Sequence, residues 1–427
     1  MLRSAFGPTL GPLREGPYLR YFIAVTISAA GSFASTIALA FGVLDAAGPA
    51  QLALIFLARE VPLVALVLAG GVFADRFPRH IVLAGSNAAQ AATQLAGAAV
   101  LIVGQASGHT STELLALLAV LNGVAGAFAR PAVAGFVPEL VSRPNLQAAN
   151  ALLGMTRNIV GIAGSVLGAG LITAIGAGWA LAFDSATFVV AAILVLTIGR
   201  GVTRAKRTES PLADLVEGFR AVKSRRWLWV TIASFGFFQM AYFPAVLVLG
   251  PQVAREHLGG PAGWAAILSL QLVGGLVGGV MATHLQATRP LVVIYIVVIP
   301  TALMLAALTL ALPLPVVAAI SALNGVGFAL SDAVWFTTLQ RNIPADALSR
   351  VSSFDWLGSI ALNPLGYAII APLSLAIGEQ ATLAAATVLL GLAITLPLAL
   401  SDVRALRMAA FDAHEGLPMA SEPSSGS

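Results

Sequence analysis

The stretch Gly71-Val-Phe-Ala-Asp-Arg-Phe-Pro-Arg-His80 places one acid and two arginines, Asp75, Arg76 and Arg79, between two long apolar segments. The bilayer core offers no water to backbone N–H and C=O groups. A chain that crosses it and returns therefore does so as a helical hairpin whose polar turn reaches one face. We interpret this stretch as a charged turn at a membrane surface.

The composition of the whole chain is that of a membrane protein. Its 427 residues are 58% hydrophobic and only 10% charged, a balance that a soluble core cannot accommodate. A spanning helix needs about 20 mostly apolar residues. Such runs are predicted at residues 18–44, 51–73, 81–103, 114–135, 151–175, 179–199, 227–250, 263–286, 290–312, 315–336, 353–376 and 380–400. We therefore predict an all-α membrane protein with twelve transmembrane helices.

Basic residues fall almost entirely on one side of these spans. Of the 23 lysines and arginines, 19 lie in segments on the side of the Asp75 turn, whereas the opposite loops hold only Arg255. Because basic loops stay in the cytoplasm, we expect both termini to be cytoplasmic and the protein to lie in the plasma (inner) membrane. The predicted parts are a cytoplasmic arm (1–17), a six-helix bundle (18–199), a cytoplasmic linker (200–226), a second six-helix bundle (227–400) and a disordered tail (401–427).

The linker is the one concentrated basic patch. Its apolar residues recur at helical spacing, which predicts an amphipathic helix on anionic lipid; a solvated linker is the alternative. These residues are Leu212, Leu215, Val216, Phe219 and Val222. The net charge of +4 follows from the cytoplasmic bias, so we expect no nucleic-acid partner.

The two predicted bundles are related in sequence. Ala-Val-Leu-Asn-Gly-Val at 119–124 and Ser-Ala-Leu-Asn-Gly-Val at 321–326 share four residues at an offset of 202, in the fourth span of each half. Repeated halves with a binding site between them are typical of secondary transporters.

The hinge from Gly71 to Arg79 resembles the signature between the second and third helices of the major facilitator superfamily. The segments Phe128-Ala-Arg-Pro-Ala, Val137-Pro-Glu-Leu-Val and Leu215-Val-Glu-Gly-Phe-Arg are similar to the branch of the enterobactin exporter and macrolide efflux proteins. The resemblance covers residues 18–400 and implies the major facilitator fold, two pseudo-symmetric six-helix bundles. The stretch from Gly164 to Gly168 resembles the antiporter-associated glycine motif, with Ser165 in place of its proline, and only suggests antiport.

In this family the hinge acid meets the start of the eleventh helix, and the arginines tie neighbouring helices together. We accordingly predict a conformational latch in which Asp75 approaches the backbone N–H groups at Ser352 and Ser353, where we place that helix start. A purely topogenic role for the two arginines is the alternative. The predicted latch residues are Gly71, Asp75, Arg76, Arg79, Ser352 and Ser353.

Motifs of enzymes and nucleotide-driven pumps are missing. Lys206 and Lys223 are the only lysines and neither follows glycine, so the chain has no phosphate-binding Walker loop. It also has no cysteine and no histidine pair with metal-ligand spacing. We therefore expect no enzyme, no cofactor and no bound metal, and a transport step driven by an ion gradient or running downhill.

Charges inside the spans are costly and should face a cavity or a partner. Arg59 and Glu60 fall near the middle of the second span. Glu60 is therefore a candidate proton-coupling site, or else a static ion pair with another helix. Arg59 is a candidate to modulate it or to contact a substrate anion.

Arg130 and Asp332 follow the repeated asparagines by eight residues each, so opposite charges occupy equivalent positions. We predict that they meet and help close the cytoplasmic gate. Asp332 is alternatively the proton carrier, and Arg130 alternatively extends to the membrane interface.

Helical periodicity predicts which side chains line a substrate cavity. The alternative is ordinary helix packing or lipid contact. Besides Arg59 the candidates are Ser28, Ser32, Ser35, Asn122, Gly126, Phe235, Phe238, Gln239, Tyr242, Asn324 and Phe328. Their aromatic share favours a bulky amphipathic ligand.

We therefore predict a monomeric, proton-coupled exporter of small amphipathic molecules, such as drugs, macrolides or siderophore-like metabolites. Its partners would be that substrate, protons and membrane lipids. The alternatives are an importer or lysolipid flippase on the same fold, and a membrane sensor or scaffold that transports nothing.

Overall fold

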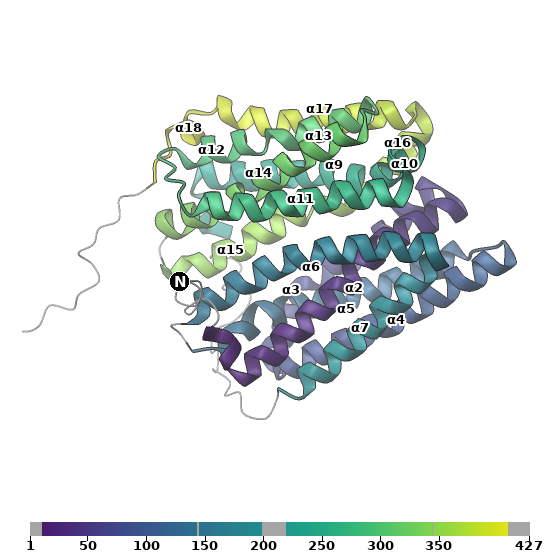
Figure 1. Ribbon diagram of the computed structural model, residues 1–427. Helices are drawn as coiled ribbons and strands as arrows, with labels where there is room; N and C mark the ends of the chain where they lie inside the picture. The colour runs from purple at the N-terminus through teal and green to yellow at the C-terminus, as the bar shows by residue number, and fades with distance from the viewer. Residues whose placement is uncertain (1–10, 143–144, 199–218, 344, 409–427) are drawn as a thin grey trace, which may run out of the picture.

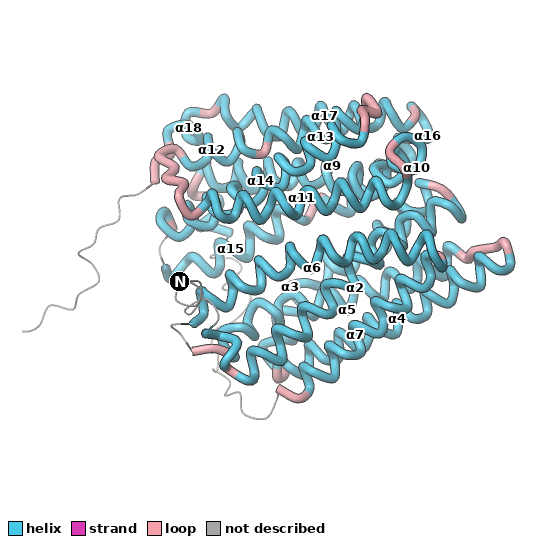
Figure 2. The backbone as a smooth tube through the Cα atoms, viewed as in Figure 1, coloured by secondary structure: helices cyan, strands magenta, loops and turns pink. Residues whose placement is uncertain are grey.

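The computed structural model of the chain describes residues 11–142, 145–198, 219–343 and 345–408. Within these ranges all regular structure is helical and no strand occurs. The helices form two bundles that lie against each other along their length (Figures 1 and 2). This confirms the predicted all-α architecture of two halves.

The first half begins with a short 3₁₀ turn and continues with six long helices. They are η1 (Gly11–Arg14), α2 (Gly16–Ala47), α3 (Pro49–Arg76), α4 (Arg79–Ser107), α5 (Thr112–Leu140), α6 (Leu146–Ile175) and α7 (Ala177–Leu196).

The second half has more breaks in its helices. Its elements are α9 (Arg226–Pro244), η3 (Ala245–Leu249), α10 (Gly250–His257), α11 (Gly260–Ala282), α12 (Pro290–Val297), α13 (Ile299–Thr309), α14 (Leu314–Asn342), α15 (Ala345–Ile360), α16 (Asn363–Ile377), α17 (Glu379–Thr395), η4 (Leu396–Ala399) and α18 (Ser401–Ala405).

Proline accounts for two of these breaks. Pro300 follows the junction of α12 and α13, and Pro364 follows the junction of α15 and α16. Proline has no backbone N–H and its ring collides with the preceding turn, so each helix is interrupted at that point. Each broken pair still crosses the bundle as one span.

Eleven segments of the described residues are long and apolar enough to cross a membrane. The predicted third span is not among them, although α4 is 29 residues long. Several amides and hydroxyls make it too polar to qualify, among them Ser86, Gln90 and Gln94. It packs between α5 and α7 inside the first half, so its polar side chains need not face lipid.

The repeat seen in the sequence recurs in the geometry of the hairpins. Gly176 joins α6 to α7 with φ of 98°, and Gly378 joins α16 to α17 with φ of 86°. These glycines lie 202 positions apart, the same offset as the repeated asparagines. Only glycine adopts such backbone angles without strain, so the same turn closes equivalent hairpins in both halves.

The halves meet mainly through two pairs of helices, α6 with α11 and α3 with α16. The buried rings of Phe56 and Tyr367 stack across the second pair at 5.6 Å. At the end of the bundle that holds the turn at Gly48, Arg255 donates to the Leu44 carbonyl at 3.2 Å and pairs with Asp45 at 3.4 Å. We call this the far end, and the end that holds the turn between α3 and α4 the hinge end.

The structure differs from our prediction of a disordered tail in residues 401–408. Residues 401–405 form α18, in which Val403 is 1% exposed and Asp402 pairs with Arg226 at 3.6 Å. One buried apolar side chain and one ion pair therefore hold this segment on the bundle. Residues 409–427 lie outside the described part of the chain.

Most of the predicted linker also lies outside the described residues, including Leu212, Leu215 and Val216. Its last turn is helical and packs on the second half. Val222 is buried in a cluster with Leu228 and Leu339, and the Phe219 ring lies 6.1 Å from that of Phe354.

Candidate functional site

Glu60 pairs with the arginine beside it on α3. Its carboxylate lies 3.1 Å from the Arg59 guanidinium, and the residue is 7% exposed. The same guanidinium lies over the Phe56 ring, 5.5 Å from the ring centroid. Glu60 thus finds its partner on its own helix. A proton on Glu60 would remove the charge that holds this pair.

Arg130 reaches from α5 to the other half of the protein. Its guanidinium carbon lies 5.6 Å from the centroid of the Trp356 ring on α15. Arg130 also interacts electrostatically with Glu60 and Arg59. Among the ion pairs of the described residues, none joins Arg130 to Asp332. The predicted gate contact stays a prediction, and the contact made here is with the indole.

Asp332 lies near a second carboxylate, Asp355, that the sequence analysis missed. The two acids interact electrostatically, and Trp335 Nε1 donates a 2.9 Å hydrogen bond to Asp355 Oδ2. Asp332 is exposed although it lies inside a span-length helix. The sequence signal for Asp355 was an acidic residue within an apolar run. We predicted that the eleventh span begins at residue 353, so Asp355 was taken to lie at the membrane surface and was not considered as a site residue.

Two contacts lie close together in the chain here, that of Arg130 with Trp356 across the halves and that of Asp332 with Asp355 within the second half. The four side chains that make them are Arg130, Asp332, Asp355 and Trp356, and we call them the interface cluster. Trp356 follows Asp355 in the chain, so Arg130 contacts α15 one residue after Asp355. The charged groups that act on Arg130 itself are Glu60, Arg59 and Arg157 of the first half.

A second missed acid, Asp184 of α7, is completely buried in the first half. Its Oδ2 accepts hydrogen bonds of 2.6 Å from Ser35 and from Gln94, and its Oδ1 accepts weaker ones of 3.4 Å from Ser32 and Thr187. Four neutral donors from α2, α4 and α7 thus surround one carboxyl group. A single acid in the apolar run of the sixth span was the signal for it.

Three serines form a stripe along α2, and their hydroxyls donate hydrogen bonds inside the first half. Ser32 and Ser35 donate to Asp184, and Ser28 donates to the Val25 carbonyl at 3.2 Å. We expected this stripe to line a cavity, whereas the structure turns two of its hydroxyls toward α7. The reason is that the buried carboxyl group of Asp184 requires hydrogen-bond donors, and these serines supply them.

The repeated Leu-Asn-Gly-Val segments have a packing role. Asn122 donates to Thr93 at 3.0 Å, and Asn324 accepts from Thr301 at 2.6 Å. The glycine after each asparagine lets a neighbouring backbone approach. A Cβ at Gly123 would lie 2.1 Å from the Arg59 carbonyl, and one at Gly325 would lie 1.8 Å from the Gln271 carbonyl.

The contacts of Gly126 are looser, because a Cβ there would meet Leu63 at an ordinary 3.5 Å. It lies one turn after Asn122 on α5, partly exposed, and the structure leaves its predicted cavity role open.

Three of the residues predicted to line the cavity from α9 and α14 lie in the core of the second half. Phe238, Tyr242 and Asn324 are 4%, 2% and 1% exposed. Their burial follows from mutual packing, since the Tyr242 and Phe328 rings lie 5.6 Å apart and the Tyr242 hydroxyl accepts from Asn324 at 3.0 Å. We expected these side chains to line a cavity, but here protein covers them.

Phe235 and Gln239 are more accessible. Phe235 stacks on Phe238 at 5.5 Å and is partly exposed. Gln239 donates to the Ser359 carbonyl at 2.9 Å, which ties α9 to α15. Both side chains are partly exposed, in contrast to Phe238 and Tyr242 on the same helix.

In the hinge, Arg79 ties α4 to α5. It donates to the Gly135 carbonyl at 2.6 Å and pairs with Glu139 at 2.5 Å. The side chain of Asp75 lies outside the described part of the chain, and Arg76 is exposed. Gly71 packs loosely, since a Cβ there would lie 4.0 Å from Pro131.

The physical basis that we gave for the latch is wrong. We expected the eleventh helix to begin at Ser352 and Ser353, but α15 begins at Ala345. Backbone N–H groups at those serines are used inside the helix and offer nothing to an acid. The side chain of Ser353 also lies outside the described part. A latch that involves Asp75 stays a prediction, but a helix start at Ser352 and Ser353 no longer supports it.

Comparison with known proteins identifies the family. The profile of the Major Facilitator Superfamily matches residues 21–361. The chain belongs to this superfamily. Members of the superfamily with similar sequences include the multidrug efflux pump Tap of Mycobacterium tuberculosis, 26% identical over 411 residues that cover 93% of this chain and 94% of Tap. The enterobactin exporter EntS of Salmonella typhi is 25% identical over 309 residues, which cover 71% and 72% of the two chains.

Solved structures of the same superfamily fold are also similar. A bacterial homologue of the human lysosomal transporter Spinster aligns with a TM-score of 0.69 at 14% identity, covering 92% of this chain and 98% of that one. The nucleoside transporter NupG aligns with a TM-score of 0.72 at 11% identity, covering 90% and 99%. The protein is therefore a multi-pass membrane transporter of this superfamily and not an enzyme.

No group of three or more His, Asp or Glu side chains that could hold a metal ion occurs among the described residues.

Proposed function

We propose that this transporter exports small amphipathic molecules in exchange for protons, by alternating access. The observation that carries the proposal is the interface cluster. It places a permanently charged guanidinium of one half against an indole of the other, on the helix that also carries Asp355. Such a group responds to protonation and joins the two bodies that move in alternating access.

The interface cluster supplies a physical coupling step. In this proposal Arg130 pairs with ionised Asp332 or Asp355 in one state of the transport cycle, and that pairing draws α5 toward α14 and α15. A proton on either acid weakens that pairing and lets the halves separate there. Each protonation state thus favours one arrangement of the halves, which is the requirement for coupling. Glu60 offers a second coupling site through its pair with Arg59.

The substrate class and direction rest on other grounds. Two relatives are a multidrug efflux pump and an enterobactin exporter. Phe235 and Gln239 give α9 an accessible aromatic ring beside an amide, a lining that suits an amphipathic ligand. The first and last described helices, η1 before α2 and α18, lie at the hinge end (Figure 1), and we propose that this end is cytoplasmic.

The test is accumulation of a panel of dyes, macrolides and siderophores in cells with and without the protein, repeated after the proton gradient is collapsed. The proposal expects lower accumulation of at least one amphipathic compound in cells with the protein, and loss of the difference on collapse. Higher accumulation would favour an importer. Unchanged accumulation of every compound would favour a non-transporting scaffold.

A further inference from the structure

Arg157 is a charged side chain inside a span-length helix, and its neighbours on α6 show which way it points. Gly154, Arg157 and Gly161 follow one another at intervals of three or four residues, so they lie on one face of the helix. Arg157 is exposed. At Gly161 a Cβ would lie 2.7 Å from Leu272 of α11 and 2.9 Å from Phe33 of α2. This face of α6 therefore lies where the two halves meet.

The opposite face of α6 is the one that suits lipid. Met155, Ile159 and Val166 also recur at helical intervals, and they are 49%, 54% and 59% exposed. Successive residues of a helix turn by about 100°, so these three side chains lie about half a turn away from Arg157. A guanidinium directed at lipid is costly, whereas apolar side chains there are not. Arg157 thus faces the interior between the halves.

Arg157 lies at the same depth as Arg130. Arg130 precedes the end of α5 at Leu140 by ten residues, and Arg157 follows the start of α6 at Leu146 by eleven. A rise of about 1.5 Å per residue places both about 15 Å from the hinge end of their helices. The two guanidinium groups also act on each other electrostatically. Two like charges therefore face the same interior space.

The acid that acts on Arg130 already has a partner. It is Glu60, whose carboxylate lies 3.1 Å from the Arg59 guanidinium. Among the ion pairs of the described residues, none involves Arg130 or Arg157. A charge inside a span needs a counter-charge or water. An anion that contacts both arginines would supply that counter-charge.

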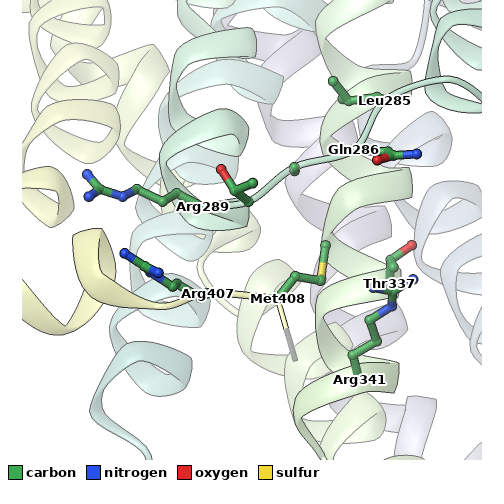
Figure 3. A pocket seen from close by; sticks show the side chains of 9 residues that line it. Leu285, Gln286, Arg289, Thr337, Arg341, Arg407 and Met408 are labelled. Atoms are coloured by element: carbon green, nitrogen blue, oxygen red, sulfur yellow. The ribbon is translucent and has the colours of Figure 1, made fainter. Parts of the chain in front are cut away.

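Arginines at the hinge end of the second half have no such requirement. Arg289 and Arg407 are exposed beside an open cavity at that end (Figure 3). Arginine side chains at the ends of spans reach water and headgroups without a protein partner. Arg130 and Arg157 lie deeper, within segments that are long and apolar enough to cross the membrane. Their charges therefore call for a ligand, and those at the hinge end do not.

Guanidinium groups bind carboxylates through paired, charge-assisted hydrogen bonds. We propose that Arg157 and Arg130 form a subsite for a carboxylate group of the transported molecule. This inference rests on the proposed export function and narrows its substrate class to amphipathic molecules that carry a carboxylate. Trp356, which is 38% exposed and contacts Arg130, offers its ring to the apolar part of such a molecule.

The subsite gives Arg130 two alternative partners during the proposed cycle. In one state Arg130 pairs with ionised Asp332 or Asp355. In the arrangement described here neither acid is among the groups that act on Arg130, and the carboxylate of the substrate takes that place. Substrate and acid then compete for one guanidinium, while Arg157 serves the substrate alone.

The test measures binding to the full-length protein in nanodiscs of phosphatidylcholine, at neutral pH and without a proton gradient. The probes are dansyl-phenylalanine, which carries a carboxylate, and its amide, which has the same rings and no charge. Binding to empty nanodiscs is subtracted. The unaltered protein should bind the carboxylate probe about tenfold more tightly than the amide, or more, as expected for hydrogen bonds to a charged group.

Variants of Arg157 then assign this preference. Arg157→Gln should lose most of the preference and bind the amide as the unaltered protein does, because Arg157 has no ion pair among the described residues to lose. Arg157→Lys keeps the charge without the planar fork of donors and should keep part of the preference. Arg404→Gln removes one charge from the exposed part of α18 and is the matched control.

Equal binding of the two probes by the unaltered protein would overturn the proposal, and so would a carboxylate preference that survives in Arg157→Gln. An equal loss in Arg404→Gln would also overturn it, because the overall charge would then be the cause. The export function fails by a different result, accumulation in cells that does not depend on the protein. If that result is found while Arg157→Gln still abolishes the preference, the subsite stands and the export function does not.

Discussion

Arg130 lies over the indole ring of Trp356, 5.6 Å from its centroid, and so joins α5 of the first half to α15 of the second. A cation over an aromatic face is attracted by the ring quadrupole, by about 0.5–2 kcal/mol depending on how far the pair is removed from water. The contact therefore contributes directly to how the two halves are held, and its loss should change their equilibrium.

Trp356→Leu should thus lower transport more than it lowers stability. It keeps an apolar side chain but removes the ring, so the guanidinium loses its partner. Trp229→Leu is the matched control, because Trp229 is 45% exposed on the same half and makes no such contact among the described residues. Transport rates and unfolding temperatures of both variants are to be compared. Equal transport by the two variants would show that the cation–π contact has no part in the cycle.

Gly325→Ala should disrupt the second half. A Cβ at this position would lie 1.8 Å from the Gln271 carbonyl, so α14 and α11 must separate. Overpacking of this kind costs about 1–3 kcal/mol or more. Gly279→Ala on α11 is the control, since a Cβ there meets nothing within 4 Å. The unfolding temperatures of both variants in detergent are to be compared. If Gly279→Ala lowers the unfolding temperature as much as Gly325→Ala does, the predicted clash at Gly325 is not the cause.

Asp184→Ala should destabilise the first half by about 1–3 kcal/mol, the usual result of leaving a buried donor without its acceptor. The hydroxyl of Ser35 and the amide of Gln94 each lose a 2.6 Å hydrogen bond. Val189→Ala, on the exposed face of the same helix, should change little. The measurement is the unfolding temperature of the purified proteins. Unchanged stability of Asp184→Ala would mean that the acid does not tie α2, α4 and α7 together.

The attachment of the chain before α2 should depend on pH. Hydrogen bonding from Asn145 is the largest cause that holds the pKa of the Glu15 carboxyl below its ordinary value of 4.5. A lowered pKa in the folded state means that the contact stabilises above the ordinary pKa and is lost as pH falls through the lowered one. The effect is small because solvent screens it.

Protease cleavage before α2, followed between pH 7 and pH 3, tests this expectation. Cleavage of the unaltered protein should increase on acidification, measured with a protease active throughout that range. Glu15→Gln should show the same cleavage at every pH. A parallel increase in both proteins would assign the effect to other groups.

Much of the fold could be predicted from the sequence, because span length and charge bias are properties of single segments. The repeat at offset 202 also led to the correct two-half architecture, and its asparagines and glycines prove to be packing residues. The helix breaks before Pro300 and Pro364 were not predicted, because each proline stands within a continuous apolar run that has the length of one span.

The site was harder to predict because it depends on which helix faces which. Ser32 and Ser35 have the right spacing for a cavity wall, yet a buried acid on α7 determines where they point. Asp355 was missed because α15 begins at Ala345, eight residues earlier than the predicted start of that span. A helix start misplaced by two turns changes an intramembrane acid into an apparent surface residue.

The central claim is that protons bound at the interface cluster drive export. The most direct measurement uses proteoliposomes with an imposed pH gradient, a pH indicator inside them and a dye that the accumulation test identifies as a substrate. The account predicts that dye added to the unaltered protein moves protons, that Asp332→Asn and Asp355→Asn lose this exchange, and that Asp402→Asn keeps it. Gradient-driven transport that survives in both Asp332→Asn and Asp355→Asn would contradict the account.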